Sequence, residues 1–200
     1  MVPAMTFAYD IRSNLIMLVD LLNTAGSIAE EGDQLTTTAR LREFAARHDF
    51  SGPLHATRQD VEETRRLRSR FASALDQSID ADTDEESDVG VRAVVDEINL
   101  TLRDSGSVPQ LVIHDHWDWH LHATGESASL ADRVAADVAL VLIDLIRSDD
   151  LNRLGRCAAA DCRAYLADFS RNRSKRFCDT GNCANRTHVA AFRARQTESD

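Results

Sequence analysis

The chain has 200 residues, enough for one domain of ordinary size and a small second one. With 43% hydrophobic and 28% charged residues, and no apolar run near the roughly 18 residues that span a bilayer, it is neither a disordered polymer nor a membrane protein. The net charge of −10 argues against a protein that binds nucleic acid through its overall charge. The last fifty residues, however, hold ten Lys and Arg against five acids, which indicates an acidic body with a tail suited to nucleic acid.

Apolar residues at helical spacing dominate the first 150 residues. Five such stripes predict helices at 15–22, 41–45, 61–79, 91–102 and 130–145. Ser13 is the expected N-cap of the first helix, and Thr57 with Asp60 and Ser129 with Asp132 resemble capping boxes. The last stripe is apolar on more than one face, so we expect that helix at the centre of the body.

Six acids crowd into the nine residues from Asp80 to Asp88. Such a charge run is typical of a solvated loop, which is the structure we expect here. The alternative is that the run competes with nucleic acid for the basic tail.

The alternation of a β-strand begins after Gly106 and Pro109, which break the helical pattern, and it extends over 110–123. We predict a β-hairpin with its turn near Asp115 and His116, and one continuous strand is the alternative. Either structure adds a small sheet to a helical body.

Four histidines lie in this segment: His114, His116, His120 and His122. One interpretation makes them exposed or hydrogen-bonded side chains beside two packed tryptophans, Trp117 and Trp119. The other brings the imidazoles together around a metal or an anionic ligand, or gives them a pH-sensing role, because histidine titrates near neutrality.

All four cysteines lie in the basic last quarter of the chain: Cys157, Cys162, Cys178 and Cys183. Four residues separate the members of each pair and fifteen separate the pairs, so two short hooks joined by a loop can surround one ion. Four thiolates close a tetrahedron around Zn²⁺ and leave no position for a catalytic water, so we predict one structural zinc ion. The N-terminus lacks the pattern of a secretory signal, so we expect a cytoplasmic protein whose thiols are reduced and free to bind a metal. The alternative to a zinc site is that the four cysteines are ordinary or redox-active thiols.

Basic side chains surround the cysteines, and we predict that they contact nucleic acid: Arg171, Arg173, Lys175, Arg176, Arg186, Arg193 and Arg195. Asn185 can cap a short final helix that carries Arg186 and Arg193 on one face, which makes these two the candidates for reading bases. Val189 and Phe192 would then pack on the zinc loop. The alternative is that the arginines offset the negative charge of a tetrathiolate zinc centre and bind the acidic body.

The segment from Asp149 to Arg195 resembles the CGNR zinc finger, in which two cysteine hooks flank a Ser-Arg-Asn loop and the second hook ends in Cys-Gly-Asn-Arg. The matching residues are Cys157, Cys162, Ser170-Arg171-Asn172, Cys178 and Cys183-Ala184-Asn185-Arg186. The sequence from Asp20 to Thr24 resembles the signature that opens the ABATE domain, which commonly precedes this finger. Ala184 departs from the pattern by replacing its glycine, and a left-handed backbone would be uncomfortable there.

The resemblance implies a zinc-bound finger that is thought to bind DNA, joined to a sensory or ligand-binding domain in bacterial stress-linked transcription regulators. We therefore expect a mainly α (α+β) fold, with a helical body at 1–150 that carries the hairpin and a four-cysteine zinc finger at 151–200 that ends in a short helix.

The predicted function is that of a DNA-binding transcription regulator whose body senses a small-molecule effector or forms a homodimer. The alternative is a zinc-stapled module that docks protein or RNA without sequence-specific DNA binding. We do not expect an enzyme, because the sequence offers no nucleophile arrangement and no phosphate-binding loop.

Overall fold

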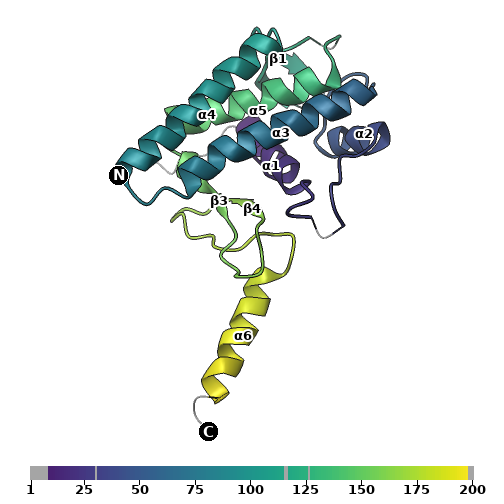
Figure 1. Cartoon of the computed structure of the whole chain (residues 1–200). Coiled ribbons are helices and arrows are strands. Elements are labelled where there is room, and N and C mark those ends of the chain that lie inside the picture. Colours follow the sequence, from purple (N-terminus) through teal and green to yellow (C-terminus); the bar gives the residue numbers. More distant parts are fainter. Residues whose placement is uncertain (1–8, 30, 115–116, 126, 198–200) are drawn as a thin grey trace. The chain divides into compact units, whose positions relative to one another are not determined.

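The computed structural model describes residues 9–29, 31–114, 117–125 and 127–197. The chain divides into two compact units, residues 1–151 and 152–200, here called the N-terminal unit and the C-terminal unit (Figure 1). Six helices and two small antiparallel hairpins make up the regular structure of the described residues, which confirms the expected mainly α fold with some β.

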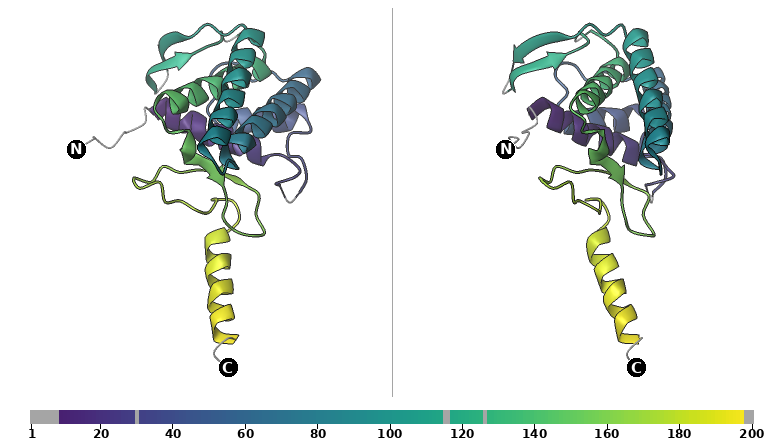
Figure 2. Two further views of the ribbon diagram at one scale, coloured as in Figure 1. Left: turned by 60° about the vertical axis from the view of Figure 1, so that its left-hand side comes forward. Right: turned by 90° about the vertical axis from the view of Figure 1, so that its left-hand side faces the viewer.

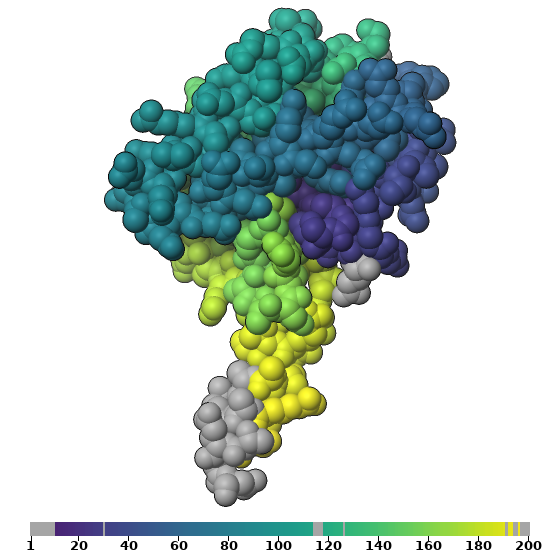
Figure 3. Space-filling view, in the orientation of Figure 1, coloured from purple at the N-terminus to yellow at the C-terminus, as the bar shows by residue number. Residues whose placement is uncertain are grey.

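Five helices and one hairpin form the N-terminal unit. They are α1 (Tyr9–Asn23), α2 (Thr38–Arg47), α3 (Arg58–Ile79), α4 (Asp84–Asp104), β1 (Gln110–His114), β2 (Trp117–His122) and α5 (Leu130–Arg147). Helix α5 contacts α1, α3 and α4, and its side chains from Val134 to Leu145 are mostly buried, so it is the central helix that its sequence predicts. Helices α3 and α4 cover one face of the unit (Figure 3).

The long helices α3 and α4 pack side by side, and a glycine sets how closely they approach. A Cβ atom on Gly90 of α4 would lie 2.5 Å from the backbone of Ser78 in α3, closer than real Cβ atoms come. The missing side chain therefore lets the two backbones touch at this point.

Capping boxes begin two of these helices. Thr57 and Asp60 exchange hydrogen bonds at the start of α3, as their sequence predicts, and Asp60 also accepts one from the N–H of Ala131 in α5 (3.1 Å). Thr83 and Glu86 form a second box at the start of α4, which the sequence analysis missed. Four of the six acids of the run therefore lie in α4 rather than in a loop, and the three in its first turn, Asp84, Glu85 and Glu86, suit the positive end of the helix dipole.

Helix α1 differs from the prediction at its start, and a buried threonine follows its end. Ser13 lies inside the helix, which spans Tyr9–Asn23, and is therefore not its N-cap. Thr24, which follows the helix, is buried, and its hydroxyl donates to the carbonyl of Leu21 (2.6 Å) and accepts from Arg68 of α3 (2.8 Å). The residue of the sequence signature thus holds an arginine in place inside the unit.

The predicted hairpin between the last two helices is present, with Leu111 opposite Leu121 and Val112 opposite His120 (Figure 2). Its outer face is apolar and exposed: Leu111, Ile113, Trp119 and Leu121 are 61%, 54%, 61% and 37% exposed. His120 on the other face is buried. Trp119 is thus not the packed tryptophan that the sequence predicts. The predicted turn near Asp115 and His116 lies outside the described residues.

A short 3₁₀ turn, Leu151–Arg153, lies at the start of the C-terminal unit, which contains β3 (Leu154–Arg156), β4 (Tyr165–Ala167) and α6 (Cys183–Thr197). Strands β3 and β4 pair antiparallel, with Arg156 opposite Tyr165. Helix α6 runs away from the loops of this unit in both views of Figure 2. Because it begins at Cys183, Asn185 lies in its first turn and is not its cap.

Candidate metal centre and basic surface

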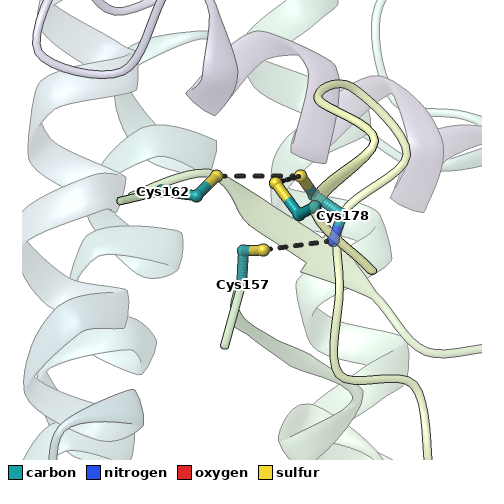
Figure 4. A group of neighbouring side chains, drawn as sticks. Cys157, Cys162 and Cys178 are labelled. Carbon is teal, nitrogen blue, oxygen red and sulfur yellow. Dashed lines mark hydrogen bonds between the residues drawn. The ribbon is translucent and has the colours of Figure 1, made fainter. Parts of the chain in front are cut away.

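The four cysteines come together although they are spread over 27 residues of the chain. Their Sγ atoms all lie within 4.8 Å of one another, and the Cys178 sulfur is 3.7 Å from those of Cys162 and Cys183. Figure 4 shows Cys157, Cys162 and Cys178 pointing toward one another. No disulfide joins them. A tetrahedron with Zn–S bonds of about 2.3 Å has sulfur–sulfur edges of about 3.8 Å, so the cluster fits one structural zinc ion.

Short backbone hydrogen bonds shape the first cysteine hook. The N–H of Cys157, just after β3, donates to the carbonyl of Ala164 (2.9 Å), and that of Cys162 donates to the carbonyl of Ala159 (3.0 Å). The N–H of Ala158 donates to the carbonyl of Arg176 (2.7 Å), which ties this hook to the loop before the second one. The β3–β4 hairpin therefore supplies the frame that sequence spacing alone did not reveal.

The second hook turns through Asn182, which has a left-handed backbone (φ +49°), and then enters α6 at Cys183. Ala184 lies in the helix, so replacing the glycine of the motif costs no backbone strain here. Gly181 is the tight position instead, because a Cβ there would lie 3.2 Å from the Cys183 sulfur.

Hydrogen-bond donors surround the sulfur atoms. The N–H of Cys178 donates to Cys157 (3.4 Å), the Thr180 hydroxyl to Cys178 (3.2 Å) and the Arg186 guanidinium to Cys183 (3.4 Å). Burial raises the pKa of Cys183 to about 12, helped by the neighbouring thiols, whereas at Cys178 the hydrogen bonds from Thr180 outweigh burial and lower the pKa to about 6. A bound cation is what would let all four thiols ionise together.

The basic loop between the hooks is built around Asp168, a buried residue that the sequence analysis missed. Its carboxylate accepts hydrogen bonds from the N–H groups of Ser170 and Lys175 (both 2.7 Å), and Arg153 donates to its carbonyl (3.1 Å). Burial alone would raise the pKa of Asp168, but these hydrogen bonds and the charge of Arg153 lower it. The loop is therefore held in one conformation with its carboxylate ionised.

The side chains predicted to contact nucleic acid have different surroundings. Arg171, Arg173 and Arg176 of the loop and Arg193 of α6 are exposed. Lys175 is 26% exposed and forms an ion pair with Asp179 (2.6 Å). For Arg195 the structure describes the backbone in α6 and not the side chain.

Arg186 is already engaged with the cysteine cluster. Besides its contact with the Cys183 sulfur, it forms an ion pair with Asp161 of the first hook (3.2 Å). This arrangement is the one expected if the arginine offsets thiolate charge, and it ties the start of α6 to the opposite hook.

The apolar residues of α6 do not pack on the zinc loop as the sequence predicts. Val189 and Phe192 are 40% and 55% exposed. The helix contacts the loop earlier, where the His188 ring meets the Phe177 ring edge-on at 6.1 Å between centroids.

Two family models match the chain, one on each unit. A model described as "Putative stress-induced transcription regulator" (ABATE) matches residues 17–149, and one described as "CGNR zinc finger" matches residues 153–196. A search among curated proteins finds no match. Among the described residues, no helix is long and apolar enough to cross a membrane.

Proposed function

Since the chain belongs to the ABATE family and carries a CGNR zinc finger behind that domain, we propose that it is a DNA-binding transcription regulator. In this proposal Cys157, Cys162, Cys178 and Cys183 hold one zinc ion, and residues 1–150 and 151–200 work as two domains. The regulator would act in the bacterial cytoplasm during stress, since the family description names stress induction and a thiolate site needs reduced cysteines.

The observation that carries the proposal is the fixed basic loop. Asp168 and the cysteine hooks hold a segment in which Arg171, Arg173 and Arg176 face solvent. Guanidinium groups suit phosphate oxygens because their planar fork of donors matches the phosphate, and a hydrogen-bonded loop has less backbone entropy to lose on binding. We assign phosphate contacts to this loop.

Helix α6 is the proposed reading element. Its exposed side chains include Arg193 and Phe192, and arginine is the residue that most often contacts guanine in the major groove. Arg195 lies two residues further along the same helix. Arg186 supports the zinc centre and keeps the base-reading role only if DNA displaces Asp161.

The alternative function is a zinc-stapled module for protein or RNA. The contacts of Arg186 and Lys175 with nearby acids favour it, because cations that serve structure are less available to DNA. Selection of bound genomic fragments by the zinc-loaded protein separates the two. Recovery of one enriched sequence, bound with a steep salt dependence and lost on chelation, supports the regulator. Failure to enrich any fragment at low salt, with one zinc confirmed per chain, supports the module.

For the N-terminal domain we propose effector sensing or dimerisation, and the apolar face of the hairpin supports a homodimer. Leu111, Ile113, Trp119 and Leu121 form this face, and a contiguous apolar patch of this kind is typical of an interaction site. A standard interface buries roughly 800 Å² on each partner, so in this proposal the four side chains form the centre of a larger two-fold contact with a second copy.

A further inference from the structure

A small pocket in the N-terminal unit has no part in the basic surface or the zinc centre. It has a volume of about 70 Å³, room for an ion with water molecules rather than a large organic effector. Polar side chains from four parts of the unit line it: Asn14 of α1, His48 after α2, His120 and His122 of β2, and Arg133 and Asp137 of α5.

The two histidines of this pocket lie against each other. They are two residues apart on β2, so they share a face of the strand, and their Nε2 atoms are 3.1 Å apart. Strand geometry places such neighbours 6.6–7 Å apart along the backbone, but the rings lean together until their centroids are 4.8 Å apart. The side chains thus bring together two donor atoms that the backbone alone would keep apart.

The backbone fixes the orientation of the His120 ring and the position of its proton. Nδ1 of His120 is 2.7 Å from the carbonyl oxygen of Asp118, and a carbonyl can only accept, so Nδ1 carries the proton. The neutral ring then carries its lone pair on Nε2, the atom that lies 3.1 Å from Nε2 of His122. A histidine that donates Nδ1–H to a carbonyl is the usual arrangement of a metal ligand.

The distance between the two nitrogens fits a shared ion. Two nitrogens about 2.1 Å from one metal lie about 2.9–3.4 Å apart, depending on whether the ion is octahedral or tetrahedral. The observed 3.1 Å falls within that range. The same distance fits a single hydrogen bond between one protonated and one free nitrogen, which is the competing interpretation.

Asp137 contributes a carboxylate to the same pocket. Burial raises its pKa to about 7, and the charge of Arg133 only partly opposes this. Arg133 directs two of its nitrogens to the backbone carbonyls of Ser51 and Pro53. The Asp137 side chain is half-buried at the pocket, so its carboxylate can accept a hydrogen bond from water there.

We propose that this pocket binds one divalent first-row transition-metal ion through Nε2 of His120 and Nε2 of His122, with Asp137 accepting a hydrogen bond from a metal-bound water. Imidazole nitrogen suits Ni²⁺, Co²⁺, Cu²⁺ and Zn²⁺ rather than Mg²⁺ or Ca²⁺. If the N-terminal domain senses an effector, this site makes that effector a transition-metal ion. Only this last step rests on the proposed sensing function.

Counting metals in the full-length protein tests the site without DNA. The protein is first loaded with zinc and freed of excess, then dialysed against micromolar Ni²⁺, and both metals are measured by mass spectrometry. We expect one zinc and one nickel per chain. The double variant His120→Gln/His122→Gln should keep the zinc and bind nickel at least tenfold more weakly, and Asp137→Asn should weaken nickel binding roughly tenfold.

His55→Gln is the matched control, because His55 is exposed outside the pocket and should not change the nickel count. His122→Gln alone keeps the test valid if the double variant fails to fold, since His122 is the less buried of the pair. A wild-type protein that binds zinc but no nickel, or variants that bind nickel like the wild type, would overturn the metal site. Either result leaves the DNA-binding proposal standing, and a metal site without DNA binding would overturn only the latter.

Discussion

Asp33 and Arg68 form a two-pronged ion pair inside the N-terminal unit. Nη1 and Nη2 of the arginine lie 3.0 and 2.6 Å from the two carboxylate oxygens, and the arginine side chain is only 5% exposed. Burial alone would raise the pKa of Asp33, but the hydrogen bonds from Arg68 and the Leu35 N–H, with the charges of Arg68 and Arg65, lower it to about 2. The carboxylate thus stabilises the unit by neutralising a buried guanidinium.

This pair predicts a pH dependence of stability. The folded pKa of about 2 lies below the 3.8 of an unperturbed aspartate, so the stabilisation is complete above about pH 4 and is lost as the pH falls through 2. Asp33→Asn should therefore reduce the free energy of unfolding by about 2–3 kcal/mol at pH 7 and by progressively less below pH 4. Urea titrations at several pH values measure this.

Glu43→Gln serves as the control, because Glu43 pairs with Arg40 on the surface, where both side chains are about 64% exposed. Its effect should stay below about 0.5 kcal/mol at every pH. A constant loss of stability in Asp33→Asn from pH 7 to pH 2 would contradict the role given to the carboxylate charge.

Removal of zinc should unfold the C-terminal unit. The unit has few apolar core residues, and the cluster joins the two hooks and the start of α6, so binding energy of the metal is folding energy here. Hydrogen exchange with and without a chelator should show loss of protection in 152–197 and unchanged protection in α3 and α5. Cys183→Ser should reproduce the loss at ordinary zinc levels. Retained protection of α6 after chelation would refute the prediction, and recovery on adding zinc back is the control.

Charge removal in the basic loop should weaken DNA binding uniformly over sequences. Arg171→Gln and Arg176→Gln each remove one exposed cation, so each should lower the slope of log K against log salt by about 1. Arg163→Gln makes the same charge change at an exposed residue outside this loop and should leave the slope almost unchanged. Equal effects at all three sites would indicate a general charge effect and not a contact surface.

Gly90→Ala should push α3 and α4 apart. The new Cβ would lie 2.5 Å from the backbone of Ser78, and backbone cannot move aside as a flexible side chain can. We expect a loss of about 1–3 kcal/mol in the free energy of unfolding. This loss is expected even though alanine has a higher helix propensity than glycine. Val89→Ala, at a neighbouring residue that is 57% exposed, should cost far less in the same thermal or urea measurement. Stabilisation by Gly90→Ala would show that the helices can separate freely.

Trp119→Ser should weaken a dimer formed through the hairpin. The side chain is 61% exposed in the single chain and would lie near the centre of the proposed contact. Light scattering coupled to gel filtration should show a dimer for the wild type and a rise of at least tenfold in its dissociation constant for the variant. Val89→Ser, which removes an exposed apolar side chain from α4, should leave the dimer intact. A monomer in the wild type at high micromolar concentration would exclude this interface.

Much of the fold is predictable from the sequence. A helix that buries one face needs apolar residues every three or four positions, and this spacing can be read directly along the chain. The five apolar stripes and the hairpin are all found in the N-terminal unit. The errors occur where local patterns compete. The charge of the acidic run alone predicts a loop, whereas Thr83 and Glu86 cap a helix there. Ser13 has the right chemistry for a cap, but α1 already includes it.

The candidate site was predictable only in part for a related reason. Cysteine spacing carries the geometry of a metal cluster, since four ligands of one kind have few other roles in such a pattern. Asp168 gave no such signal, because its partners, the N–H groups of Ser170 and Lys175, are found only once the loop has folded. The side-chain approach of His120 and His122 likewise depends on how the rings lean, which backbone spacing does not determine.

Helix α6 begins at a metal ligand, and its exposed side chains beyond His188 include Val189, Phe192 and Arg193. Substitutions at these exposed positions therefore change little of what keeps the protein folded. In most proteins a change of binding specificity is limited by its cost to stability. Here that constraint is relaxed along α6, so the helix is free to diversify over evolution while the four sulfur atoms at its base keep it anchored.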